Sequence, residues 1–141
     1  MPFLLETTAL AELTKPRPND GFVRWLSDNA MDDGFIAAPS IGEIESGIAM
    51  LQDKAKQQRL AMWLDELIRE YADRILPLDD ACARIWGRAV GSARRRGATL
   101  ALVDSQIAAI AYVHELPIVT RNTRDFHTPP FDKIRLLNPW D

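Results

Sequence analysis

Short apolar runs alternate with longer helical patterns along the chain of 141 residues. In the longest pattern, residues 54–73, apolar side chains recur three and four positions apart, as on one face of a helix. Strands that alternate with helices are usually joined by crossovers, which make neighbouring strands parallel. We therefore predict an α/β fold with a short, mostly parallel central sheet, flanked by helices and containing more helix than strand. The apolar runs expected to form it are 3–5, 35–38, 74–78, 118–120 and 133–137.

The length and charge of the chain limit the classes of protein that it can belong to. We expect residues 1–141 to form a single domain, because the chain has room for one core. No apolar run is long enough to span a bilayer and no secretion signal is recognisable, so we expect a cytoplasmic protein without a membrane partner. A net charge of −3 argues against a protein that coats nucleic acid by bulk attraction. It does not exclude a local basic rim around an acidic site.

Four carboxylates stand where the chain leaves a predicted strand or enters the next helix. Glu6 follows the first strand, and Asp125 follows run 118–120. Glu43 is expected in the first turn of a helix capped by Ser40, and Asp104 in the first turn of a later helix. Because ligands bind beyond the carboxyl ends of parallel strands, we expect these acids to converge there. Crowded carboxylates favour a cation, and Mg²⁺ or Mn²⁺ prefers oxygen ligands.

A divalent ion at such an edge suits the hydrolysis of phosphodiesters, with one or two ions. Arg121 and Arg124 lie near the same edge in the sequence and could bind the phosphates of a nucleic acid. An acid in the first turn of a helix also stabilises the helix dipole, so Glu43 or Asp104 taken alone could serve stability. The coincidence of four acids favours a site. We interpret the basic run 94–96 chiefly as a solvated helix end, with an RNA-binding patch as the alternative.

Five stretches resemble, in order and spacing, the motifs of the PIN-domain ribonuclease toxins of the VapC group, including its FitB-like members. They are "LLETTALAEL", "SIGEIESGI", "LALVDSQIAAIA", "IVTRNTRDF" and "LNPW". The resemblance implies a PIN fold and a metal-dependent endoribonuclease toxin that acts on RNA, with transfer RNA as one candidate substrate. It also implies a small antitoxin protein as partner, a homodimer, and contact with operator DNA only through the antitoxin.

Residue by residue, the resemblance assigns the acidic metal site to Glu6, Glu43, Asp104 and Asp125. Thr8 would be the hydroxyl neighbour of Glu6, and Asn122 would orient water through its amide oxygen. Two positions depart from the pattern. Glu6 replaces the usual aspartate and is one methylene longer, and Asn122 stands where some members carry the acid that we assign to Asp125.

Two alternative functions follow from these departures and from the acid arrangement. If the longer side chain of Glu6 prevents metal binding, the protein is a catalytically weakened or inactive PIN scaffold that retains antitoxin binding. A magnesium-dependent, receiver-like phosphoacceptor domain would also gather acids at strand ends. That domain needs a lysine after a late strand, whereas Arg121 stands there.

Overall fold

The computed structural model describes residues 1–29 and 31–140, except for the side chains of Met31 and Asp125. Its strands form one five-stranded sheet in the order β3-β2-β1-β4-β5, and every neighbouring pair is parallel. The predicted parallel α/β fold is therefore confirmed. The strands are β1 (Phe3–Leu5), β2 (Gly34–Ala37), β3 (Ile75–Leu76), β4 (Ile118–Val119) and β5 (Leu136–Leu137).

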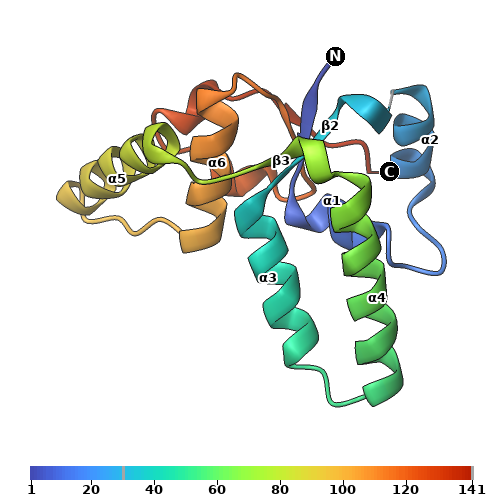
Figure 1. The fold of residues 1–141 in the computed structure, drawn as a ribbon. Coiled ribbons are helices and arrows are strands. Elements are labelled where there is room, and N and C mark those ends of the chain that lie inside the picture. Colours follow the sequence, from blue (N-terminus) through green and yellow to red (C-terminus); the bar gives the residue numbers. More distant parts are fainter. Residues whose placement is uncertain (30, 141) are drawn as a thin grey trace.

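Helices cover both faces of this sheet, and α3 and α4 extend beyond it side by side (Figure 1). The α-helices are α1 (Thr7–Glu12), α2 (Asp20–Asp28), α3 (Ala38–Ala49), α4 (Lys54–Glu70), α5 (Asp80–Arg95) and α6 (Leu102–Val113). Short 3-10 helices are η1 (Met31–Asp33), η2 (Ala72–Arg74), η3 (Thr123–Phe126) and η4 (Phe131–Lys133). No helix in the described ranges is long and apolar enough to cross a membrane.

The alternation of side chains along β1 divides the interior into two cores. Leu4 points to the face covered by α5 and α6, where it packs with Ile118 and Ile107. Phe3 and Leu5 point to the opposite face, covered by α1, α2 and α4. Successive residues of a strand face opposite sides of a sheet, so three fully buried residues in a row are what a two-sided core requires.

The start of α3 differs from the prediction. The helix begins at Ala38, directly after β2, and Ser40 lies inside its first turn as a buried residue rather than at its N-cap. Pro39 fits the first turn because the amide that it lacks would have no partner within the helix there, and the helix begins without a hydrogen bond from a capping side chain. Glu43 consequently lies in the second turn, so the predicted cap at Ser40 and the predicted first-turn position of Glu43 were wrong.

The C-terminal segment is attached to the end of α1 through a buried carboxylate. The ring of Trp140 lies 4.8 Å from that of Phe22, and its indole N–H donates to Glu12 Oε1 at 3.0 Å. Glu12 also accepts from the Asn19 amide at 2.8 Å and from Lys15 Nζ at 2.9 Å. Burial raises the pKa of Glu12, but these hydrogen bonds outweigh it and lower the pKa to about 2. The group therefore stays ionised at neutral pH.

Candidate metal centre at the carboxyl edge of the sheet

Three of the four predicted acids lie at the same edge of the sheet. β1 lies between β2 and β4 and is parallel to both, so the carboxyl ends of the three strands share an edge. Glu6 follows β1, Glu43 comes six positions into α3, and Asp104 lies in the first turn of α6 as predicted. Helices α1 and α6 both contact α3. The chain thus brings these carboxylates from distant parts of the sequence to one rim.

Glu6 is the N-cap of α1, which explains why a charge can stand at the end of a buried strand. Its side chain is only 2% exposed, and its two oxygens accept from the Thr8 amide at 2.8 and 3.0 Å. A carboxylate at a helix N-terminus satisfies an otherwise unpaired amide and lies favourably in the helix dipole. Glu6 therefore has a structural role in addition to any role in metal binding.

The electrostatics of Glu6 connect it to the other acids. Its pKa is raised from 4.5 to about 7, chiefly because the group is buried and to a smaller extent because Asp104 and Glu43 carry negative charge. The amide and hydroxyl of Thr8 act in the opposite direction but are weaker than the burial. Near neutral pH this carboxyl group therefore holds a proton part of the time. A divalent cation could replace the proton, because it would neutralise the same excess of negative charge.

Hydroxyl groups join the segments that form this edge. The Thr7 hydroxyl donates to Ser40 Oγ at 3.1 Å, which links α1 to α3. Thr8 Oγ1 accepts from the Arg121 amide at 3.1 Å, and Thr120 Oγ1 accepts from the Asn122 amide at 3.0 Å. Thr8 is the hydroxyl neighbour of Glu6 that was predicted. Its hydroxyl also holds the backbone after β4 against α1.

Sequence reasoning overlooked Thr120, which is fully buried. The register pairs Leu5 with Val119, so Thr120 follows β4 as Glu6 follows β1. Alignment of the two predicted strand ends could have found it. It places a second polar side chain at the same level of the sheet.

The residues predicted to meet the substrate lie just beyond β4. A hollow of about 390 Å³ is lined by Arg121, Asn122, Thr123 and Arg124. The two arginines and the asparagine are exposed, as phosphate-binding groups must be. Asp125 belongs to η3, but its side chain lies outside the described part of the chain. Its assignment as a metal ligand remains a prediction.

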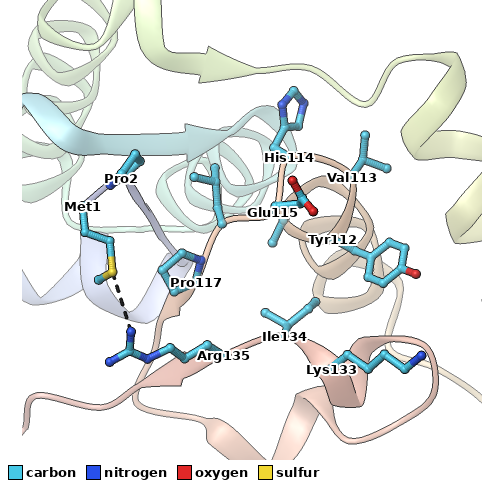
Figure 2. Close-up of a pocket in the computed structure, with 12 residues that line it drawn as sticks. Met1, Pro2, Tyr112, Val113, His114, Glu115, Pro117, Lys133, Ile134 and Arg135 are labelled. Carbon is cyan, nitrogen blue, oxygen red and sulfur yellow. Dashed lines mark hydrogen bonds between the residues drawn. The ribbon is translucent and has the colours of Figure 1, made fainter.

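A larger hollow of about 830 Å³ lies at the opposite edge of the sheet (Figure 2). Its lining includes Pro2 before β1, Pro117 before β4 and Arg135 before β5, with Arg135 Nη1 at 3.7 Å from Met1 Sδ. These positions are the amino ends of the strands. Since Glu6 lies at the carboxyl ends, this hollow is separate from the acid edge despite its size.

The acid edge suits a hard divalent cation, although its carboxylates are spread out. Among the described residues, no three carboxylate, thiol or imidazole side chains are close enough to enclose a metal ion. Mg²⁺ is commonly held by one or two carboxylates and several waters, so an open arrangement fits it. The oxygen donors of Glu6, Asp104 and Glu43 and the raised pKa of Glu6 both match such an ion.

The sequence matches the PIN domain family over residues 3–131. The chain belongs to the PIN domain family. Toxin FitB of Neisseria gonorrhoeae is 33% identical over 138 residues, which are 97% of this chain and 97% of that protein. A VapC ribonuclease of Sinorhizobium fredii is 25% identical over 139 residues, 98% of this chain and 97% of its own. The family resemblance of the sequence motifs is thereby confirmed.

Solved structures agree with this assignment. The crystal structure of FitAcB from Neisseria gonorrhoeae superposes with a TM-score of 0.85 at 32% identity, covering 98% of each chain. FitAB bound to a DNA fragment superposes with a TM-score of 0.83 at 31% identity, over 99% of this chain and 96% of that one. The five-stranded sheet and its flanking helices are thus the PIN fold.

Proposed function

We propose that this PIN-domain protein is the toxin of a toxin–antitoxin pair and hydrolyses RNA phosphodiester bonds with Mg²⁺ or Mn²⁺. The observation that carries the proposal is the buried Glu6 carboxyl group, whose pKa is raised to about 7 and which is influenced by Asp104 and Glu43. A buried acid with a perturbed pKa beside other acids is typical of functional sites. The similarity to a VapC ribonuclease and to toxin FitB supports RNA as the substrate.

Different residues of the chain would bind the ion and the substrate. Glu6, Asp104 and Glu43 would hold the ion, with Asp125 as an outer ligand. When bound, a divalent ion supplies Lewis-acid activation of water and neutralises charge on the phosphate. Asn122, which is exposed beyond β4, would orient the attacking water through its amide oxygen.

Substrate binding falls to the segment after β4. Arg121 and Arg124 are exposed cations beside the acid edge and would bind the phosphates that flank the cleaved bond. The Thr8 hydroxyl, which accepts from the Arg121 amide, fixes the backbone of this segment relative to Glu6. The two binding functions are therefore joined through a single threonine.

The partners follow from the complexes that the chain resembles. We expect a small antitoxin protein to neutralise the toxin and a homodimer to form, with transfer RNA among the candidate substrates. Similarity to FitAB bound to DNA supports a complex on operator DNA. Because this chain has a net charge of −3, the antitoxin would supply the DNA contacts. The reaction would take place in the cytoplasm, where its RNA substrates are made.

One observation favours the inactive-scaffold alternative. Both oxygens of Glu6 accept from the Thr8 amide, so the carboxylate is turned toward its own helix. If this arrangement persists in the presence of metal, the protein would bind its antitoxin without cutting RNA. No comparable observation favours the phosphoacceptor alternative, since Arg121 replaces the lysine which that chemistry needs.

The proposal is tested by incubating the antitoxin-free protein with total bacterial RNA in Mg²⁺, Mn²⁺ or EDTA. We expect cleavage that requires metal and is lost in the Asp104→Asn variant. Glu6→Asp, which restores the usual family residue, should cut at least as fast as the parent. Cleavage by Glu6→Asp but not by the parent would establish the scaffold alternative. If every folded variant is silent on this RNA pool, the nuclease proposal is wrong.

A further inference from the structure

Helix α5 presents a row of cations to solvent. Arg84, Arg88 and Arg95 are all exposed and are separated by four and seven positions. At 3.6 residues per turn, their side chains leave the helix within about 40° of one another, and at 1.5 Å per residue the row is about 17 Å long. Within the described residues, none of the three forms a salt bridge. We call these three residues the arginine row.

A hollow with basic residues at its rim and an apolar floor of Ile85, Ala89, Pro129 and Pro130 adjoins the arginine row. Its volume is about 380 Å³, and it lies between α5 and the segment around η4. Arg88, Ser92 and Lys133 contribute polar atoms to its lining, and Asp132 is its one acidic residue. Arg96 Nη1 donates to Ser92 Oγ at 3.2 Å, which brings a further guanidinium to the same side of the helix. The hollow therefore combines a concave shape with an excess of positive charge.

This charge distribution is unusual for an acidic chain with an acidic site. A polyanionic substrate is repelled by the net charge of −3 and by the carboxylates at the sheet edge. Local cations must compensate, because nucleic-acid affinity comes largely from phosphate neutralisation. Arg121 and Arg124 supply two charges close to the acids, and the arginine row supplies three more at a distance.

The arginine row is held rigidly relative to the acid edge. Helix α5 contacts α6, and Asp104 lies in the first turn of α6. The indole N–H of Trp86 donates to Ser105 Oγ at 2.9 Å, at the residue next to Asp104. A substrate bound on α5 would therefore have a fixed position relative to the acids.

We infer that the arginine row and its hollow bind the phosphate backbone of a double-helical segment of the RNA substrate, away from the bond that is cut. The inference rests on the proposed ribonuclease function and adds to it a second surface that contacts the RNA substrate. The row and the hollow lining contain no aromatic residue on which an unpaired base could stack. A row of cations without aromatic side chains suits contacts to the phosphate backbone, through which a duplex is recognised by its shape.

The test compares two triple variants in the Asp104→Asn background with EDTA, so that binding is measured without cleavage. One variant replaces Arg84, Arg88 and Arg95 by glutamine, and the matched control replaces Arg17, Arg59 and Arg69, which are exposed elsewhere. Both lower the net charge by the same amount. The RNA probe is a hairpin of about 16 base pairs, the length that a double-stranded RNA domain covers.

We expect affinity of the control protein for the hairpin to fall more steeply with salt than affinity of the arginine-row variant. Three lost phosphate contacts reduce the slope of log affinity against log salt by about 2.7. Across a fourfold rise in salt, the control should therefore lose about 40-fold more affinity than the arginine-row variant. Equal salt dependence of the two variants would overturn the inference, since bulk charge alone would then account for binding.

Two further measurements separate the possible failures. Sedimentation reports the oligomeric state of each variant. If only the arginine-row variant changes its oligomeric state and still binds the hairpin, α5 is a contact between copies of the chain, and RNA binding there is refuted. Cleavage of total bacterial RNA by the parent in Mg²⁺ tests the nuclease itself. If the parent does not cut but the salt dependences differ as expected, the proposed catalysis fails while the RNA-binding surface stands.

Discussion

Removal of the negative charge of Glu6 should stabilise the protein at alkaline pH and have little effect in acid. Glu6→Gln keeps the length of the side chain and an oxygen that can accept from the Thr8 amide. It removes an ionisable group that is 2% exposed and whose pKa is raised from 4.5 to about 7. The variant therefore isolates the cost of ionising this buried carboxyl group.

The direction of this pH dependence follows from the linkage between proton binding and folding. A carboxyl group whose pKa is higher in the folded state favours folding while it is protonated, so its contribution is most favourable below the unfolded pKa of 4.5. That contribution is lost as the pH rises through about 7. With 1.36 kcal/mol for each pKa unit, Glu6 lowers the free energy of unfolding by about 3 kcal/mol between pH 4.5 and pH 8.

The assay is urea unfolding in EDTA at several pH values between these limits, with the parent and the variant measured side by side. The difference in unfolding free energy should be small near pH 4.5 and grow by about 3 kcal/mol toward pH 8, in favour of Glu6→Gln. Glu45→Gln, an exposed change on α3, controls for the loss of one negative charge. Parallel stability curves for the parent and Glu6→Gln would refute the reasoning.

Other predictions concern the ion, the C-terminus and the thiol. Mg²⁺ at about 100 times its Kd should raise the free energy of unfolding by about 2.7 kcal/mol, as measured by calorimetry. At a fixed Mg²⁺ concentration this gain should be larger at pH 8 than at pH 6, and it should be absent in Asp104→Asn. Trp140→Phe removes a hydrogen-bond donor that helps to lower the pKa of Glu12, so acid unfolding should begin at a higher pH. The free energy of unfolding near pH 7 should fall by about 1.5–3 kcal/mol. An unchanged midpoint of acid unfolding would contradict this. Burial raises the pKa of Cys82 to about 11, so iodoacetamide should label it only after unfolding, as mass spectrometry would show.

The sequence pattern predicted the helices whose extent and ends depend on residues close together in the chain. The apolar stripe of 54–73 corresponds to α4, and Asp79 and Gly97 occupy the ends of α5 as their residue types indicate. Asp79 accepts from the Cys82 amide at 3.1 Å, and Gly97 adopts a φ of +77°, which favours glycine. Each of these features involves contacts only a few residues apart.

The sequence could not predict features that depend on distant contacts. The hydrogen bond from Trp140 to Glu12 joins residues 128 positions apart, and nothing in the pattern around either residue indicates it. The position of Glu43 was wrong by about one turn because Pro39 allows α3 to start directly at the end of β2. Candidate acids were found because strand ends can be read from sequence, whereas their separation depends on how α3 and α6 pack.

The chemistry of the RNA ends tests the central claim, metal-dependent hydrolysis at the acid edge, most directly. The measurement is to map the termini of RNA cut by the parent in Mg²⁺, with Asp104→Asn and EDTA as controls. Attack by water should leave a 5′-phosphate and a 3′-hydroxyl, in products that are absent from both controls. Products with 2′,3′-cyclic phosphates that persist in EDTA or in Asp104→Asn would show attack by the ribose hydroxyl without the metal site, and would contradict the account.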